Sequence, residues 1–212
     1  MSVEDHFVPP LAGSSDEAFS LRRQLKRETA TLHQRLEARL GLLEPPLSIH
    51  RYRQVLEKFY GFYAPVEIRL ARLAAAGPQI GFPLRARAGL IESDLVALGL
   101  SERELTELPW CAELPPLSCP EHLAGCLYVL EGACLGGQVV ARALQAQLGV
   151  AKGSGASFFV GDADGTAARW LLVVTWLEGL VRVGARTEQI VASARETFLT
   201  LARWLELQGA SR

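Results

Sequence analysis

Apolar residues that recur at the period of an α-helix constrain this chain more than any other feature. Near the N-terminus, leucines stand four or seven residues apart, which places them on one helix face; they are Leu21, Leu25, Leu32, Leu36 and Leu40. Apolar residues follow at helical spacing between Ser48 and Leu70. No stretch keeps the strict alternation of a half-buried β-strand. The sequence therefore predicts an all-α protein.

Glycine, proline and capping residues mark where these helices begin and end. Residues 1–13 contain Pro9, Pro10 and Gly13 and are expected to form a flexible arm, with a single helical domain over residues 14–208. Ser101 and Glu104 form a capping-box pattern, which predicts a short helix there. The other helices are expected at 14–40, 48–76, 83–98, 120–149, 164–183 and 187–207.

Composition limits the class of protein. The 212 residues carry 22 basic and 23 acidic side chains, a net charge of -1, so we expect no basic face for nucleic acid. Hydrophobic residues make up 49%, enough for one globular core. The apolar stretches 123–141 and 170–181 are interrupted by Glu131 and Glu178, so we expect core helices and no membrane span.

The cysteines and the N-terminus indicate a cytoplasmic protein with reduced thiols. No two of the four cysteines form a C-x-x-C pair, and their spacing does not match a zinc site. Residues 1–20 are acidic and polar, unlike a signal peptide. Cys126 and Cys134 lie in an apolar helix and are interpreted as small core residues.

Glycines cluster inside the helix expected at 120–149. Gly132, Gly136 and Gly137 occupy its interior and Gly125 stands slightly earlier. Each interior glycine costs about 1 kcal/mol relative to alanine, so an offsetting gain is required. Close packing against another helix is one explanation, and the glycines alone favour it. The other is that bare backbone approaches a flat ligand where a Cβ would collide.

His33 lies at the edge of the leucine stripe in the first helix. A lone histidine there is usually a core or boundary residue, but two neighbours on its face raise the chance of a ligand role. Glu37 is one turn away and could accept a hydrogen bond from Nδ1, as carboxylates do beside metal-bound histidines. Lys26 lies about 10.5 Å back along the axis, where an ammonium could reach a carboxylate of a ligand.

Other catalytic patterns find little support. His6, His50 and His122 fall in the arm or in first helical turns and are expected to be exposed. The chain has no H-E-x-x-H or E-x-x-H motif for a metal centre. Nucleophilic catalysis by serine or cysteine with histidine has no positional support either.

Four stretches together resemble the heme oxygenase family. LKRETATLHQRLE (25–37) is similar to its proximal helix, and YVLEGACLGGQVV (128–140) to its glycine-rich distal helix. GASFFVGDADGTAARW (155–170) and ASARETFLTLARWL (192–205) are similar to the bacterial branch that supplies biliverdin to phytochromes. The resemblance extends over residues 20–207, and the histidine and glycine blocks are specific in combination.

The resemblance implies a helical bundle that holds heme b between its first and fifth helices. It further implies oxidative opening of heme to biliverdin, CO and ferrous iron, with O₂ and electrons from a reductase or ferredoxin. A bacteriophytochrome is the implied acceptor of biliverdin. A neutral histidine ligand leaves one axial position of the iron open for O₂.

The same resemblance implies roles for individual residues. On the proximal side, His33 matches the iron ligand, Glu37 the carboxylate that supports it, and Lys26 a basic residue at a heme propionate. On the distal side, Gly132 and Gly136 match the glycines that let the helix approach and bend over the heme, and Gly137 continues that motif.

Two positions depart from the family pattern. Many members carry an aspartate directly after the first distal glycine, where it holds a water network, and this chain has Ala133. The late basic residues that clamp propionates have no clear match, and Arg169 is the candidate. Two alternatives to the enzyme therefore stay open, a non-catalytic heme carrier on the same fold and a helical protein-interaction module.

Overall fold

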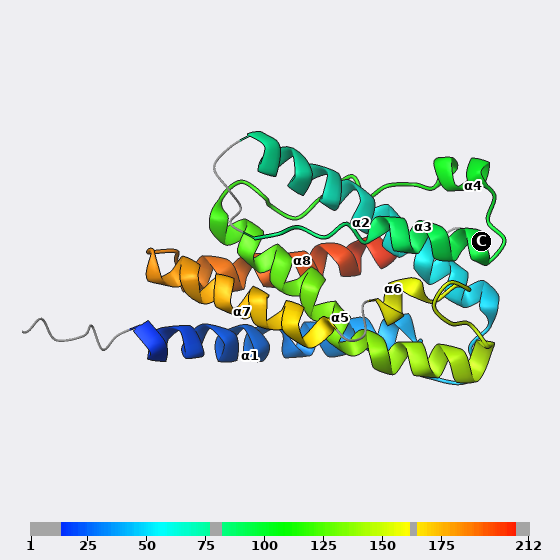
Figure 1. Ribbon diagram of the computed structural model, residues 1–212, viewed down its shortest axis with the longest axis horizontal. Coiled ribbons are helices and arrows are strands. Elements are labelled where there is room, and N and C mark those ends of the chain that lie inside the picture. Colours follow the sequence, from blue (N-terminus) through cyan, green and yellow to red (C-terminus); the bar gives the residue numbers. More distant parts are fainter. Residues whose placement is uncertain (1–13, 77–81, 162–164, 207–212) are drawn as a thin grey trace, which may run out of the picture.

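The computed structural model describes residues 14–76, 82–161 and 165–206, and these form eight helices and no strand (Figure 1). The expected arm at 1–13 and the end of the expected domain at 207–208 lie outside the described residues. The helices are α1 (Ser14–Leu40), α2 (Ile49–Ala76), α3 (Ala88–Ala97), α4 (Glu102–Glu107), α5 (Pro120–Leu148), α6 (Ser157–Val160), α7 (Thr166–Arg182) and α8 (Thr187–Glu206).

Most helix ends fall where the sequence predicts them. Gly41, Gly99 and Gly149 follow α1, α3 and α5 with positive φ angles of 61°, 90° and 71°, a conformation that glycine adopts without steric cost. Ser101 accepts from the Glu104 N–H while the Glu104 carboxylate accepts from the Ser101 N–H, so the predicted capping box is confirmed. The glycine and proline signals thus set the bounds of these helices.

Two local expectations are wrong. The third helix begins at Ala88 rather than near Pro83 because Glu67 of α2 accepts from the Arg87 and Ala88 backbone N–H groups at 2.8 and 3.1 Å. The loop after α5 contains the unexpected four-residue helix α6. Asp94 of α3 accepts from the Ser157 and Phe158 N–H groups at 2.7 Å each and so holds the start of α6.

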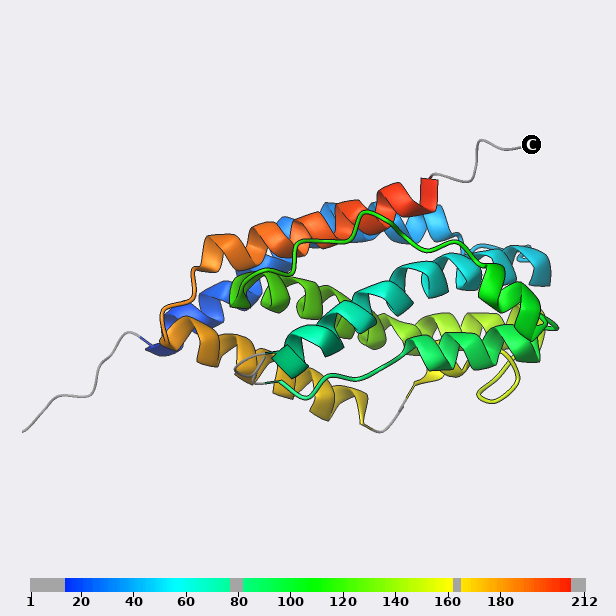
Figure 2. The same ribbon diagram turned by 90° about the horizontal axis from the view of Figure 1, so that it is seen from above.

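Helix α8 is the main packing partner in the bundle. It contacts α5 most extensively, and Figure 1 shows α5 crossing it; it also contacts α1, and Figure 2 shows these two helices running side by side. Helix α5 crosses the bundle and additionally packs against α7 and α6. Although α5 is long and apolar enough to span a membrane, its position among these three helices is that of a core helix.

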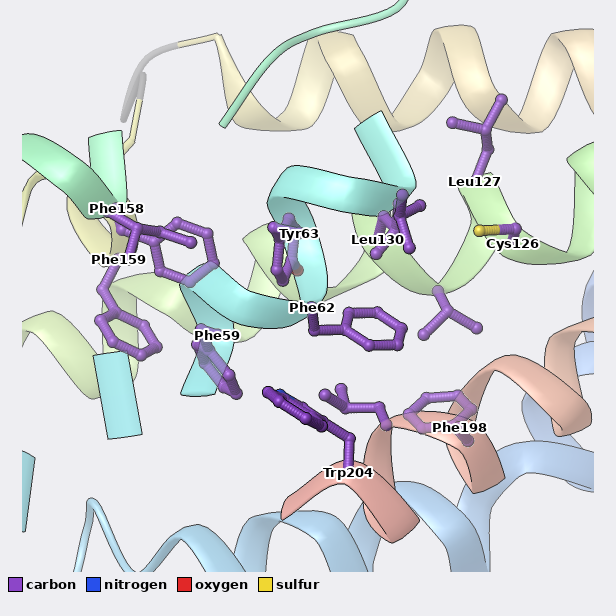
Figure 3. Close-up of a cluster of buried hydrophobic side chains, with 14 of the residues drawn as sticks. Phe59, Phe62, Tyr63, Cys126, Leu127, Leu130, Phe158, Phe159, Phe198 and Trp204 are labelled. Atoms are coloured by element: carbon purple, nitrogen blue, oxygen red, sulfur yellow. The ribbon is translucent and has the colours of Figure 1, made fainter. Parts of the chain in front are cut away.

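Aromatic side chains fill the core between α2, α6 and α8. Figure 3 shows the ring of Phe59 between those of α6 and Trp204 of α8, and Phe59 and Phe158 have centroids 5.7 Å apart. The Trp204 indole N–H donates to the Lys58 carbonyl at 2.7 Å, which satisfies its polar atom in the core. Cys126 is fully buried on α5, and burial raises the pKa of its thiol to about 12.

The contact between α5 and α8 depends on a glycine. A Cβ added to Gly125 would lie 2.5 Å from the Ile190 carbonyl oxygen, the Ala194 nitrogen and the Ser193 Cβ. Real Cβ atoms do not approach backbone this closely, so the two helices can be this near each other only because residue 125 is glycine.

Gly125→Ala is expected to destabilise the fold by about 2 kcal/mol or more, because the steric conflict with α8 outweighs the helix propensity gained. Gly179→Ala in α7 is the matched control. No atom lies within 4 Å of its added Cβ, so propensity alone should raise stability by about 1 kcal/mol. Urea unfolding followed by circular dichroism measures both; equal stability of the two variants would contradict the close α5–α8 contact.

Candidate functional site

The glycines of α5 fall into two groups by what surrounds them. Gly125 and Gly137 are buried against backbone, and a Cβ on Gly137 would lie 2.5 Å from the Phe159 carbonyl oxygen of α6. Gly136 is exposed, and among the described residues no atom beyond its chain neighbours and its own helix backbone lies within 4 Å of its added Cβ. Around Gly132 the nearest atoms are the edge of the Trp170 ring, at an ordinary 3.6 Å. Helix packing thus explains Gly125 and Gly137 but leaves Gly132 and Gly136 unexplained.

Gly137 needs a correction on this account. We expected it to continue the surface that faces the cofactor, but the structure turns it toward α6. Its neighbour Gln138 reinforces that contact by donating from Nε2 to the Val160 carbonyl at 2.7 Å. Gly137 therefore seats α5 on α6.

An apolar surface surrounds Gly132 and Gly136, here called the open glycines because no described backbone of another helix lies close to them. Leu135 and Val139 stand three and seven residues after Gly132, hence on the same helix face as Gly132 and Gly136. Their side chains are 44% and 54% exposed, unusual for large apolar residues on the main core helix. Ala133 is exposed beside this face. A flat apolar group could lie here against bare backbone.

On α1, His33 has one neighbour on each side. Its Nδ1 lies 3.3 Å from Glu37 Oε2, close to hydrogen-bonding distance. The edge of its ring meets Phe198 of α8, with centroids 5.9 Å apart at 78°. The imidazole is half exposed, at 48%. Because Glu37 is the partner of Nδ1, the Nε2 atom is the one left for a ligand.

The two candidate helices are held by shared partners. Helices α1 and α5 both pack against α8 and α7, and the Tyr128 side chain of α5 is close enough to interact with Thr29 of α1. Lys26 is exposed on α1, seven residues before His33. His33, Lys26 and the backbone at the open glycines thus lie on two helices that share α7 and α8 as packing partners.

Arg169 also needs a correction. We expected it to reach a propionate, with an exposed surface arginine as the alternative. Instead its side chain is 11% exposed and forms an ion pair with Glu131, which is 5% exposed. The Nε atom donates to Glu131 Oε2 at 3.1 Å, and a terminal nitrogen donates to the Pro83 carbonyl at 2.6 Å. The Glu131 carboxylate holds this guanidinium within the protein.

Trp170 and Tyr128 are neighbours of the site that the sequence analysis did not single out. Their rings lie 5.5 Å apart, and the Trp170 edge is the nearest side chain to Gly132. Burial raises the pKa of Tyr128 above its ordinary value. Tyr128 stands four residues before Gly132, so helical spacing could have indicated its position, whereas Trp170 arrives from α7 with no local signal.

The remaining histidines do not join this site. His50 is exposed at the start of α2, and His122 Nδ1 lies 3.0 Å from Ser118 Oγ; His6 lies outside the described residues. Within the part of the chain that the structure describes, no three His, Cys, Asp or Glu side chains converge as a metal site made of protein alone requires. A single histidine is sufficient where a porphyrin supplies the other nitrogen ligands.

Comparison with known proteins identifies the family. The family model described as heme oxygenase matches residues 19–207. A heme oxygenase of Xanthomonas campestris pv. campestris (strain 8004) is 31% identical over 149 residues, covering 69% of this chain and 84% of that protein.

Two solved structures share the fold. Heme oxygenase from Neisseria meningitidis, in its NO- and CO-bound forms, aligns with a TM-score of 0.67 at 24% identity, covering 90% of this chain and 94% of that one. The enzyme from Leptospira interrogans aligns with a TM-score of 0.69 at 22% identity, over 88% and 98% of the two chains. Because the family model spans nearly the whole chain, this protein belongs to the heme oxygenase family.

Proposed function

We propose that this heme oxygenase binds heme between α1 and α5, with His33 Nε2 on the iron and the backbone at Gly132 and Gly136 against the opposite face. The family reaction converts heme to biliverdin, CO and ferrous iron, using O₂ and electrons from a donor protein. One observation carries the assignment of the site. Of the four α5 glycines discussed, only Gly132 and Gly136 lack a close contact with described backbone of another helix, and the half-exposed apolar side chains of Leu135 and Val139 flank them.

On the proximal side, the chain orients one histidine. Glu37 beside Nδ1 favours the tautomer with the proton on Nδ1 and the lone pair on Nε2. Phe198 limits rotation of the ring from the other side. His33 is the residue that would hold the heme iron, through the neutral Nε2 nitrogen. Lys26, exposed seven residues before His33 on α1, is the proposed partner of a propionate at the heme edge.

On the distal side, the chain contributes shape. Because glycine has no Cβ, it lets the α5 backbone approach the heme plane more closely than any other residue type would at the same position. Leu135 and Val139 cover apolar porphyrin edge and exclude bulk water from it. The porphyrin itself supplies the redox chemistry once reduced, and the protein fixes its orientation. Ala133 has no polar side-chain atom, so ordered water here would rely on backbone groups and other side chains.

The finer assignments are part of the same proposal. Heme b is the proposed substrate, a reductase or ferredoxin the proposed electron donor, and a bacteriophytochrome the proposed acceptor of biliverdin. The cytoplasm is the proposed location. The resemblance of residues 155–170 and 192–205 to the phytochrome-associated branch supports the choice of acceptor.

Ala133 favours one second function, that of a heme carrier which binds heme without opening it. The two functions differ in what happens after hemin has bound. Under air with ascorbate or a reductase, an enzyme converts the Soret band into biliverdin absorbance, whereas a carrier keeps the Soret band.

His33→Ala is expected to abolish histidine ligation and to reduce turnover to background, because no other described histidine lies at this site. The measurement is a hemin titration followed by Soret absorbance and resonance Raman spectroscopy. Added imidazole should restore the ligated spectrum by occupying the space of the missing side chain. Helix content should not change, because the side chain is half exposed.

His50→Ala is the matched control, since His50 is exposed on α2. It should leave both spectrum and turnover as in the wild type. If His33→Ala binds hemin with an unchanged spectrum, or if imidazole restores nothing, His33 is not the ligand.

Gly136→Ala and Gly137→Ala are expected to act in opposite directions on the ligand-free protein. Gly136→Ala should raise its stability by about 1 kcal/mol through helix propensity, because its Cβ meets no atom. Gly137→Ala should lower stability by about 1–3 kcal/mol through conflict with the Phe159 carbonyl. Urea unfolding without heme measures both.

The same two variants distinguish a glycine that contacts the ligand from a glycine that packs against another helix. Gly136→Ala should weaken hemin binding although it stabilises the ligand-free fold. The added alanine Cβ would occupy space that heme fills at the proposed site. A Gly136→Ala protein that is more stable and binds hemin as tightly as the wild type would remove Gly136 from the site.

A further inference from the structure

An ion pair between α5 and α7 lies next in sequence to residues of the proposed distal surface. Glu131 of α5 is buried, and the side chain of Arg169 of α7 is 11% exposed. The guanidinium is held on several sides at once. It donates from Nε to Glu131 Oε2 at 3.1 Å and to the Pro83 carbonyl at 2.6 Å, and it lies 4.4 Å over the Phe82 ring. A planar group with this many fixed contacts has one orientation.

Each partner of the pair precedes a residue at the site. Glu131 is followed by Gly132, and Arg169 is followed by Trp170. The Trp170 ring rests on Tyr128 at 5.5 Å, and its edge lies 3.6 Å from the position of a Gly132 Cβ. The ion pair therefore holds two neighbouring positions together, the backbone at Gly132 of α5 and the Trp170 side chain of α7 that lies beside it.

We propose that the Glu131–Arg169 pair positions Trp170 as a wall beside Gly132 and thereby determines which edge of the heme lies against α5, and so which biliverdin isomer forms. This inference rests on the proposed heme site. The propionates of heme lie on one edge, but its four meso positions are chemically similar, so the one that lies against α5 depends on how the surroundings turn the ring in its plane. A rigid indole at one side of the bare backbone makes those surroundings asymmetric. Arg169 acts through Trp170 and is a positioning residue.

The opposing interpretation is that the pair only stabilises the fold. Removing one partner of a buried pair leaves an uncompensated charge and is destabilising whatever else the pair does. Stability alone therefore cannot distinguish the two roles. Replacing both partners by apolar residues of similar size removes the charge problem, because such replacements are often neutral.

The test uses Arg169→Met and the double variant Glu131→Leu with Arg169→Met. Arg182→Met is the matched control, because Arg182 is on the same helix in an exposed pair with Glu178 at 3.5 Å. The first readout is the ratio of biliverdin isomers, separated by chromatography. The second is Trp170 emission in the ligand-free protein, taken as the difference between each protein and its Trp170→Phe counterpart.

The expected result is a red shift of Trp170 emission and a change in the isomer ratio in both pair variants, with neither effect in Arg182→Met. If Arg169→Met does not fold, the double variant decides. Lower stability with unchanged emission and isomer ratio would overturn the inference and leave the proposed function intact. Absence of hemin binding by the wild-type protein would overturn both.

Discussion

Close contact of backbone at two glycines of α5 determines where the neighbouring helices can lie. Gly125 lets α8 approach until its backbone fills the space of a Cβ, and Gly137 does the same for α6. These contacts lie on either side of Gly132 and Gly136 along the helix. With α5 held at both contacts, its intervening face is presented in a fixed orientation. Gly132 and Gly136 therefore keep a fixed orientation, although neither has a close contact with the described backbone of another helix.

Buried carboxylates complete this arrangement by joining segments that are distant in sequence. Asp94 holds the start of α6 from 63 residues away, and α6 in turn carries the carbonyl that meets Gly137. Burial raises the pKa of Asp94, while the two backbone donors that it accepts from act in the opposite direction. A carboxylate that satisfies two N–H groups removes the cost of burying the end of so short a helix. The position of the distal surface thus depends on polar contacts as well as on packing.

The sequence predicts what depends on local signals and misses what depends on distant partners. Helix ends at Gly41, Gly99 and Gly149 follow from the conformational freedom of glycine and are confirmed. The start of α3 and the existence of α6 depend on Glu67 and Asp94, which act across elements, so no local pattern indicates them. The sequence shows that α5 contains four glycines, but it does not show which of them pack against another helix. That depends on which residues of other helices lie opposite each glycine, and no local pattern records it.

The open glycines have an energetic consequence for an enzyme of this family. Gly136 lowers helix stability by about 1 kcal/mol relative to alanine, and no protein contact offsets this cost. Leu135 and Val139 add apolar surface that stays in contact with water until something covers it. A ligand that binds only the folded state returns stability in proportion to its concentration over its dissociation constant. The stability of the fold and the binding of its substrate would therefore be linked, because the surface that weakens the ligand-free bundle is the one on which we propose that heme binds.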